Sequence, residues 1–361
     1  MSIRTCCCFK PLSPSDMKTK RIIMMALSVS ILGLFCYKSY RVLWALNVAL
    51  NTPTVDVYIP SDPDFGILLT AVEPYLKRPS EFILLAQLKR LDQYPRSGHY
   101  VLKNGMSNLE LIESLRSANE PIVLKFNNQE RLEDLVGTLS RQIEPDSLEL
   151  LMAFKNQEFL TKAQMNSETL LTLFVPNSYE VYWNVSAEGI GQRMLTEYRA
   201  FWNADRLEKA KAINLTPTQV AILASIVQKE SVKPSERPII AGVYLNRLRR
   251  NMPLQADPTV IFAKKKMEND YQQIIRRVLY KDLTLDSPYN TYKYAGLPPG
   301  PITMPDINSI DAVLNAKRHR YLYFVADPNR PGFHDFSRSL SQHNRKRRAY
   351  INWIKKQGIK R

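Results

Sequence analysis

One glutamate in this sequence has surroundings that favour acid chemistry. Glu230 ends the run VAILASIVQKE, whose apolar residues recur at helical spacing. Ile226 and Val227 precede it by four and three positions, so its side chain is expected on the same face as this apolar stripe. Partial burial and the negative end of a helix both disfavour a charged carboxylate. A carboxyl group that stays protonated near neutral pH can serve as a general acid.

The helix that would carry this glutamate has a well-defined start. Thr216 suits the N-cap, Pro217 the first helical position, and Gln219 the third position of a capping box. The alternative for a single glutamate is an exposed side chain or an ion pair, here with Lys233 or Arg237. For a glutamate taken alone, this alternative is the commoner one. The loops that follow the helix shift the balance toward a functional acid.

Three loops rich in proline, tyrosine and amide side chains follow this helix. They read MPLQADPT (252–259), SPYNTY (287–292) and GLPPGPI (296–302). Proline fixes the backbone of such loops, and glycine permits the close approach of another segment. Their tyrosine, asparagine, glutamine and threonine side chains offer the hydrogen bonds that a sugar needs. Three such loops beside a helix-borne acid are expected to form a site rather than packing alone.

Two further segments are weaker candidates. The extended aromatic run FVPNSYEVYW (174–183) suits sugar rings, although such runs more often form core. Glu236 and Arg237 open another helix and are expected to orient that junction, with a structural salt bridge as the favoured interpretation. His334 and His343 lie late in the chain, where packing or surface roles are equally plausible.

Metal chemistry has little support in the sequence. The four cysteines are Cys6, Cys7, Cys8 and Cys36, so no thiolate is available to a zinc site in the later part of the chain. The first three are most simply reduced thiols. The four histidines show no HExxH spacing, which excludes the helix-borne zinc protease motif. We therefore expect neither a metal nor a cofactor.

The net charge of +16 is concentrated at the two ends of the chain. Residues 1–21 carry a net +4 and residues 338–361 a net +9, which leaves +3 for the body between them. A nearly balanced body argues against nucleic acid as a partner. The C-terminal run is predicted to be either a solvated, fraying tail or a patch attracted to anionic lipid or polymer.

Residues 22–37, IIMMALSVSILGLFCY, contain no charged side chain. At about 1.5 Å per residue this helix falls somewhat short of a ~30 Å hydrocarbon core, but Lys20, Arg21, Lys38 and Arg41 can extend to the interface. The basic N-terminal flank predicts a single span of the cell (inner) membrane, with the N-terminus cytoplasmic and the body extracytoplasmic, or periplasmic. The alternative is a cleaved signal peptide, for which no suitable pair of small residues follows.

We expect an α+β protein with helices around a small antiparallel sheet. Its expected parts are a cytoplasmic tail (1–21), a transmembrane anchor (22–44), a small α+β module (45–125), a larger catalytic domain (126–345) and a basic tail (346–361). A parallel α/β sheet is disfavoured because strands and helices do not alternate regularly. Ser107 and Glu110 form a predicted capping box, and Asn128 is predicted to cap the first helix of the larger domain.

Taken in order, these segments resemble the endolytic murein transglycosylase family, also called the YceG-like family. The matching stretches are FVPNSYEVYW, ASIVQKES, AGVYLNRL, MPLQADPTVIFA, SPYNTY, GLPPGPI and YLYFVA, followed by His334, Phe336 and His343-Asn344. They run in order from about residue 174 to residue 344. Upstream, SGHYVLKNGMSNLELIESL resembles the LysM-like subdomain of the family, and the single N-terminal anchor agrees with it.

The resemblance implies an enzyme that cuts the MurNAc–GlcNAc bonds of nascent peptidoglycan strands internally, leaves 1,6-anhydro-MurNAc ends and so terminates strand elongation. It places the catalytic glutamate at Glu230. Many members have a second glutamate two positions earlier, where this chain has Gln228. Ala256 stands where a hydroxyl residue is common, and Asp306 where glycine often follows proline. These departures concern fine substrate contacts and not the reaction.

The implied reaction needs only one carboxyl group. Protonated Glu230 gives its proton to the glycosidic oxygen and then takes a proton from the C6 hydroxyl of the same muramic acid, which closes on C1. The side chains expected to hold the glycan or its acetamido groups are Asn246, Gln255, Tyr289, Asn290 and Tyr292. Asp257 is expected either to polarise a partner directly or to cap the segment that follows it.

Two other functions stay in competition with this one. A non-catalytic peptidoglycan-binding scaffold would bind glycan through the LysM-like module and dock cell-wall synthases through the larger domain. A glutamate without a raised pKa would favour that scaffold. A binder of anionic polymers would instead act through the basic C-terminal run. The resemblance also implies work beside peptidoglycan synthases, although no residue here identifies that contact.

Overall fold

The computed structural model describes residues 14–117 and 119–357. Predictions about Cys6–Cys8 and about residues 358–361 therefore lie outside the described residues. The described chain combines helices with short strands, so the predicted mixed α+β class is confirmed. Each of its three sheets has two strands, which are β1 with β2, β3 with β4, and β5 with β6.

The chain divides into two compact units. The first consists of Met1–Ile122 with Tyr182–Asn184, and the second of Val123–Val181 with Val185–Arg361. The first unit contains α1 (Pro14–Leu43), β1 (Thr54–Ile59), α2 (Phe65–Val72), the 3-10 helix η1 (Glu73–Tyr75), α3 (Pro79–Leu88), β2 (Gly98–Lys103) and α4 (Asn108–Ser117).

The core of the first unit lies between its antiparallel strands and its short helices. Strand β1 pairs with β2 so that Thr54 lies opposite Lys103 and Ile59 opposite Gly98. The predicted capping box at the start of α4 is confirmed. The Ser107 N–H donates to Glu110 Oε2 at 2.7 Å, and the Glu110 N–H donates to Ser107 Oγ at 3.3 Å. The Ser107 hydroxyl also donates to Glu110 Oε2 at 2.9 Å, and the two hydrogen bonds that Ser107 donates to this carboxyl lower its pKa.

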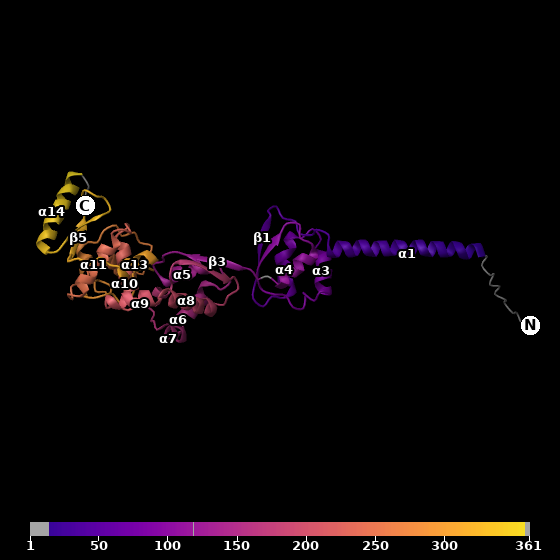
Figure 1. Cartoon of the computed structure of the whole chain (residues 1–361), viewed down its shortest axis with the longest axis horizontal. Helices are drawn as coiled ribbons and strands as arrows, with labels where there is room; N and C mark the ends of the chain where they lie inside the picture. The colour runs from indigo at the N-terminus through magenta and orange to yellow at the C-terminus, as the bar shows by residue number, and fades with distance from the viewer. Residues whose placement is uncertain (1–13, 118, 358–361) are drawn as a thin grey trace, which may run out of the picture. The chain divides into compact units, whose positions relative to one another are not determined.

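Helix α1 contains the stretch Met17–Leu43, which is long and apolar enough to cross a membrane (Figure 1). Its apolar side chains are exposed, as a lipid-facing helix requires and a core helix would not allow. This agrees with the apolar helix predicted from residues 22–37 and is compatible with a single-pass anchor. The end of α1 packs against α3 and α4.

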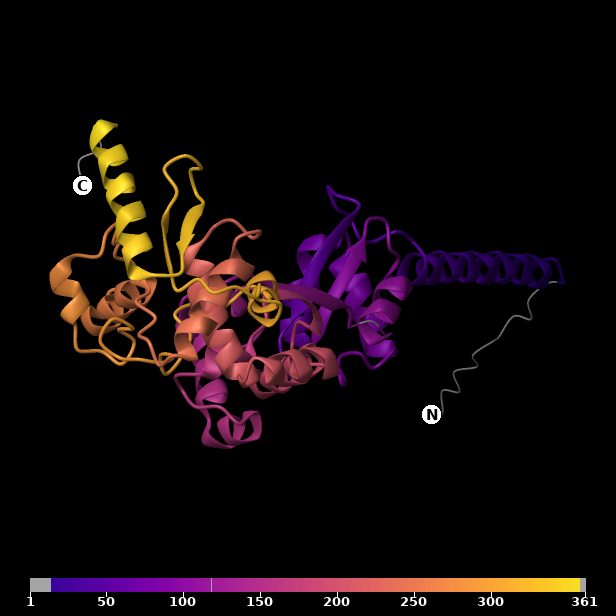
Figure 2. The same cartoon turned by 60° about the vertical axis from the view of Figure 1, so that its left-hand side comes forward.

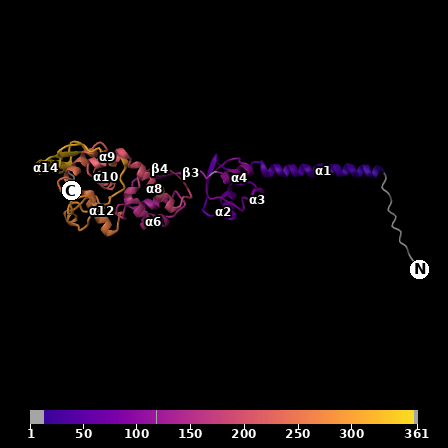
Figure 3. The ribbon, with the colours of Figure 1, turned by 60° about the horizontal axis from the view of Figure 1, so that its bottom comes forward.

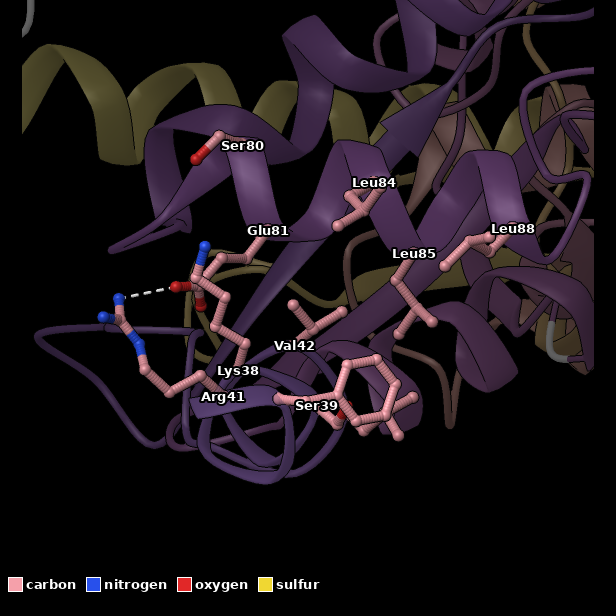
Figure 4. A pocket seen from close by; sticks show the side chains of 11 residues that line it. Lys38, Ser39, Arg41, Val42, Ser80, Glu81, Leu84, Leu85 and Leu88 are labelled. Atoms are coloured by element: carbon pink, nitrogen blue, oxygen red, sulfur yellow. Dashed lines mark ion pairs between the residues drawn. The ribbon is translucent and has the colours of Figure 1, made fainter. Parts of the chain in front are cut away.

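A groove of about 620 Å³ lies between α1 and α3 (Figure 4). It is mainly apolar, with Leu84, Leu85 and Leu88 of α3 directed toward it. Its one acid, Glu81, pairs with Arg41 at 2.5 Å and with Arg78 at 2.6 Å. Because both ion pairs neutralise this carboxylate, the groove offers no free acid for catalysis.

The second unit is larger and mostly helical. Wholly or in part, it contains β3 (Pro121–Phe126), α5 (Leu132–Leu139), α6 (Ser147–Lys155), α7 (Gln157–Ala163), η2 (Leu170–Leu173), β4 (Asn177–Tyr182), α8 (Ala187–Phe201), α9 (Ala204–Ala212), α10 (Pro217–Glu230), α11 (Arg237–Leu248), α12 (Asp257–Glu268), η3 (Tyr280–Thr284), α13 (Ile307–Leu314), β5 (Tyr323–Ala326), β6 (His334–Ser337) and α14 (Leu340–Lys356). The aromatic run expected to be extended thus forms β4.

Helix α10 runs through the core of this unit. Every residue from Val220 to Val227 is buried, so the helix is covered on all sides. It packs against α9, α11, α12 and α13, and Figure 3 shows it between α9 and α12. Burying one large aliphatic side chain stabilises a fold by about 1.5–3 kcal/mol, so this helix is held firmly in place.

The predicted start of α10 is confirmed. Thr216 Oγ1 accepts the Gln219 N–H at 3.2 Å, and Gln219 Oε1 accepts the Thr216 N–H at 2.9 Å. Pro217 occupies the first turn, where a missing N–H costs nothing. The helix ends at Glu230, the residue that the sequence singled out.

The prediction for Asn128 is wrong. Helix α5 begins at Leu132, with Arg131 at the N-cap. The Asn128 amide instead donates to the Met304 carbonyl at 2.9 Å, which ties this segment to the loop before α13. A short polar side chain before an apolar run can cap a helix or bridge to a distant carbonyl, and here the distant partner prevails.

The basic C-terminal run differs from the fraying tail that was one of the expectations. Its residues up to Lys356 belong to α14, which packs against β5 and β6. Figure 2 shows this helix in yellow beside the β5–β6 hairpin. The Lys346 ammonium pairs with Asp335 at 3.2 Å, and Ile354 is buried. Lys346 and Ile354 therefore help to hold α14 against the rest of the unit, although its composition alone suggests a fully solvated segment.

Replacing Thr216 with alanine removes the cap of α10 and is expected to cost about 1 kcal/mol of unfolding free energy. The measurement is guanidinium unfolding of the full chain in detergent, followed by tryptophan fluorescence, since Trp202 lies in the core around α10. Thr161→Ala is the matched control, because the hydroxyl of this exposed threonine exchanges hydrogen bonds with Gln157 of the same helix, α7, and caps no helix. Equal midpoints for the two variants would contradict the capping role.

Candidate active site

Glu230 lines an open cavity of about 360 Å³ in the second unit. The remaining wall residues come from α11, the loop into α12, the loop after η3, strand β5 and helix α14. They are Arg247, Leu254, Gln255, Asp257, Tyr292, Tyr323, Phe324, Leu340, His343, Asn344 and Arg347. Helix α10 therefore positions the side chain of its last residue, Glu230, in a cavity that is open to a ligand.

The Glu230 carboxyl is largely shielded from water, although the residue keeps some exposed surface in the cavity. Burial raises the pKa of this carboxyl to about 7. The negative charge of Asp257 also raises the pKa, whereas the hydrogen bond from Tyr244 and the positive charge of Arg247 lower it. Near neutral pH the group can therefore both give and accept a proton.

Two residues of α11 contact or face this acid, and sequence reasoning missed both. The Tyr244 hydroxyl donates to Glu230 Oε1 at 2.8 Å, and its ring is fully buried. Arg247 lies one helical turn further along. Its guanidinium donates to the carbonyls of Leu322 at 2.7 Å and Leu254 at 2.8 Å. The available signal was the spacing of three positions, which places Tyr244 and Arg247 on one face of the helix.

Asn246 lies between these two residues in sequence but is directed elsewhere. Its amide donates to the carbonyls of His319 at 2.9 Å and Tyr321 at 3.0 Å. It lines a separate cavity of about 430 Å³, which Glu230 does not line. Its expected contact with glycan stays a prediction.

Three of the predicted residues share the cavity with Glu230, namely Gln255, Asp257 and Tyr292. The Tyr292 hydroxyl donates to Asp257 Oδ1 at 2.5 Å. Gln255 has a φ of 50°, in the left-handed region that non-glycine residues seldom occupy. Its N–H donates to the Thr291 carbonyl at 3.0 Å, which helps to hold this conformation.

Asp257 is the first residue of α12, at the end of the helix where the macrodipole is positive. Glu230, by contrast, is the last residue of α10, at the negative end of that helix. The two acids of the cavity thus lie at opposite helix ends.

Tyr289 and Asn290 do not line this cavity. The Tyr289 hydroxyl donates to Glu168 Oε2 at 2.6 Å. Asn290 is fully buried, and its amide donates to the Leu283 and Leu285 carbonyls at 3.0 and 2.8 Å. These contacts fix the loop that presents Tyr292. A direct role of Tyr289 or Asn290 in glycan binding stays a prediction.

Glu236 and Arg237 hold the turn between α10 and α11. Glu236 is buried and accepts the His334 backbone N–H at 2.7 Å, while its other oxygen lies 2.7 Å from His334 Nδ1. The Arg237 guanidinium pairs with Asp306 at 2.9 Å and donates to the Ser231 carbonyl at 3.2 Å. Both side chains connect the segment after Glu230 to other parts of the unit.

Gln228, which replaces a glutamate common in the resembling family, has a clear structural contact. Its Oε1 accepts the Asp306 backbone N–H at 2.6 Å. Asp306 in turn accepts the Ser309 N–H at 2.6 Å and caps α13. An amide oxygen can accept this hydrogen bond in the place of a carboxylate oxygen, so glutamine keeps the junction between α10 and α13.

The last wall of the cavity consists of β5 and α14. The rings of Tyr323 and His343 are stacked with their centroids 5.4 Å apart, and the Arg247 guanidinium lies 5.2 Å from the Tyr323 ring centroid. Sequence reasoning noted His343-Asn344 and the stretch that contains Tyr323 without assigning these residues a role, and it did not single out Arg347. The distance along the chain hid them, since β5 and α14 follow Glu230 by several other elements.

The buried acid, the open cavity and the mixed α+β fold together define a site for general acid chemistry. A sequence model of the YceG-like family matches residues 58–349. Because this match covers most of the chain, the chain belongs to the YceG-like family.

Named relatives agree with this assignment. The endolytic murein transglycosylase of Bacillus subtilis (strain 168) is 28% identical over 318 residues, which cover 83% of this chain and 85% of that protein. A protein of the same name from Streptococcus pneumoniae (strain D39) is 27% identical over 285 residues, covering 71% of this chain and 51% of that protein. The crystal structure of a yceG-like protein from Listeria monocytogenes has a TM-score of 0.54 at 26% identity, and the match covers 81% of this chain and 98% of that one.

Replacing Tyr244 with phenylalanine is expected to raise the pKa of Glu230 further above 7. The reason is that the hydrogen bond from Tyr244 stabilises the charged carboxylate and so lowers this pKa in the wild type. Carbon NMR of labelled glutamate side chains measures the shift, with Glu230→Gln assigning the signal. Tyr94→Phe, at an exposed tyrosine of the first unit, is the control. An unchanged or lower pKa in Tyr244→Phe would contradict this account of the site.

Proposed function

We propose that this chain is a lytic transglycosylase, a lyase that cuts the MurNAc–GlcNAc bonds of peptidoglycan internally and leaves 1,6-anhydro-MurNAc ends. The relatives named endolytic murein transglycosylase support the substrate and the reaction class. The observation that carries the proposal is the placement of the Glu230 carboxyl, which lines an open cavity with a pKa of about 7.

The reaction follows from this one group. Protonated Glu230 gives its proton to the glycosidic oxygen as the bond from C1 of MurNAc breaks, which frees the 4-hydroxyl of GlcNAc. Positive charge develops on the MurNAc ring, as in other glycosidic cleavages. The Glu230 carboxylate then accepts the proton of the C6 hydroxyl, whose oxygen bonds to C1. Because the nucleophile belongs to the same sugar, neither water nor a second reactant is consumed.

The neighbours of Glu230 suit both halves of this cycle. Burial favours the protonated acid that the first step needs. The Tyr244 hydroxyl and the Arg247 charge stabilise the carboxylate that exists between the two steps. A pKa near 7 keeps the two forms close in free energy, so neither proton transfer is strongly uphill.

We propose that Gln255, Asp257 and Tyr292 bind the sugar beside this acid, because all three line the same cavity. Asp257 would face the positive charge that develops on the MurNAc ring, because it lines the cavity together with the reacting acid. Asn246, Tyr289 and Asn290 would contribute through the loops that they fix, since their amide and hydroxyl groups already have partners within the fold.

We also propose that α1 anchors the chain in the cell membrane, with its N-terminus in the cytoplasm and both units on the extracytoplasmic (periplasmic) side. The exposed apolar surface of α1 supports a membrane span. The basic residues Lys18, Lys20 and Arg21, near the N-terminal end of this helix, support the orientation. We assign residues 45–125 as a LysM-like, glycan-binding module. On that side of the membrane the chain would meet nascent strands, and cleavage beside the peptidoglycan synthases would terminate their elongation.

Wild-type protein is expected to convert uncrosslinked peptidoglycan strands into shorter strands with 1,6-anhydro ends. Glu230→Gln removes the transferable proton and should lower this rate by about 10²–10⁴-fold. Mass spectrometry of the products from the full chain in detergent measures both the ends and the rate. Glu208→Gln, at an exposed glutamate of α9, is the control and should behave like the wild type.

The second carboxylate gives the contrasting test. Asp257→Asn is expected to slow the reaction while the products keep their anhydro ends. Reducing ends from the wild type would instead indicate hydrolysis with Asp257 as a second catalytic carboxylate. Binding of glycan by folded wild-type protein without any cleavage would favour the non-catalytic scaffold.

The rate of cleavage is expected to fall as pH rises above about 7. Only the protonated form of Glu230 starts the reaction, and this carboxyl loses its proton as pH passes through its pKa of about 7. Above that point kcat/KM should decrease about tenfold for each pH unit. A pH series of initial rates tests this, and Tyr244→Phe should move the decline to higher pH. A flat profile through neutral and mildly alkaline pH would exclude Glu230 as the acid.

A further inference from the structure

Helix α14 turns one face toward the cavity that contains Glu230. The four residues of α14 that line the cavity are Leu340, His343, Asn344 and Arg347. They are separated by three, one and three positions, which places them on a single side of the helix. The neighbouring cations Arg345 and Arg348 are exposed and do not line the cavity. Helix geometry therefore places Arg347 at the cavity and directs Arg345 and Arg348 away from it.

The orientation of this face is fixed by contacts on both sides of it. The His343 ring is stacked on Tyr323 of β5, and the Lys346 ammonium pairs with Asp335 and donates to the Phe336 carbonyl at 2.9 Å. The buried side chain of Ile354 holds the later turns. Arg347 therefore projects from a helix that cannot rotate without breaking these contacts.

The charge of Arg347 is available to a ligand. Within residues 14–117 and 119–357 it forms no ion pair, and its Nη2 donates to the exposed Tyr280 hydroxyl at 3.5 Å. The other arginine of the cavity, Arg247, is buried and donates to backbone carbonyls. The two cavity acids have other partners, since Asp257 accepts a hydrogen bond from Tyr292 and Glu230 accepts one from Tyr244.

We propose that Arg347 and the α14 face around it bind a carboxylate carried by the substrate. This inference rests on the proposed function, in which MurNAc occupies the cavity. MurNAc differs from its neighbouring sugar by a lactyl group on O3, which ends in a carboxylate or continues into a stem peptide with carboxylates of its own. An arginine matches a carboxylate through two parallel N–H donors, so α14 would select the sugar that must lie next to Glu230.

The test uses the full chain in detergent and three forms of the glycan strand. The first carries stem peptides, and the second has been stripped by an amidase and keeps one lactyl carboxylate on each MurNAc. In the third form that carboxylate has been converted to a methyl amide. Arg347→Gln should raise KM about five- to tenfold on a charged strand while kcat changes little. On the methyl amide strand its KM should equal that of the wild type.

The charged strands identify the source of the carboxylate. An effect on the stripped strand alone supports the lactyl carboxylate, and an effect on the peptide-bearing strand alone supports a carboxylate of the stem peptide. An effect on both strands means that the site accepts either carboxylate. Arg347→Glu should raise KM further by repulsion. Arg348→Gln is the matched control, one position away on an exposed side of the helix, and should behave like the wild type.

Three results would overturn this inference without touching the proposed function. One is wild-type kinetics for Arg347→Gln on every strand. Another is an equal loss on the charged and the methyl amide strands, which would mean that Arg347 merely supports the wall. The third is an equal effect of Arg348→Gln. Failure of the proposed function looks different, because wild-type protein would then release no anhydro-ended product from any strand.

Discussion

A carboxyl group withdrawn from water at the end of a buried helix is the constraint on which the second unit depends. Keeping Glu230 in this environment requires that α10 be covered on all sides and that its end not fray. Two polar side chains of α10 accordingly hold the backbone of other segments in place. The Ser225 hydroxyl accepts the Ile302 N–H at 3.1 Å, and Gln228 accepts the Asp306 N–H at 2.6 Å. Buried polar groups with satisfied hydrogen bonds fix a geometry that apolar packing alone leaves adjustable.

The same constraint explains the loops around the cavity. Gly300 lies so close to the Glu168 carbonyl that any side chain there would overlap it. Thr259 and Thr291 share a buried hydrogen bond at 2.8 Å, which joins α12 to the loop that carries Tyr292. The rigid loops therefore serve mainly to hold each other and α10, and only a few of their side chains reach the cavity.

Local signals in the sequence were sufficient for α10 and for the position of Glu230, because a capping box and an apolar stripe are determined within one helix. They were insufficient for the rest of the cavity. Tyr289 and Tyr292 have the same side chain and lie three positions apart, yet one turns to Glu168 and the other to Asp257. Tyr244 needed knowledge of how α11 packs on α10. In residues 338–361, nine basic residues with no acid suggested a solvated end, because the partner of Lys346 lies earlier in the chain, on β6.

The place of α14 along the chain also determines when the cavity is complete. Helix α1 is made first, α10 follows, and α14 is the last described element to leave the ribosome. In a growing chain the cavity around Glu230 therefore lacks one wall until α14 has folded onto β5 and β6. The order of synthesis alone thus delays the moment at which the cavity beside Glu230 is complete in a newly made molecule.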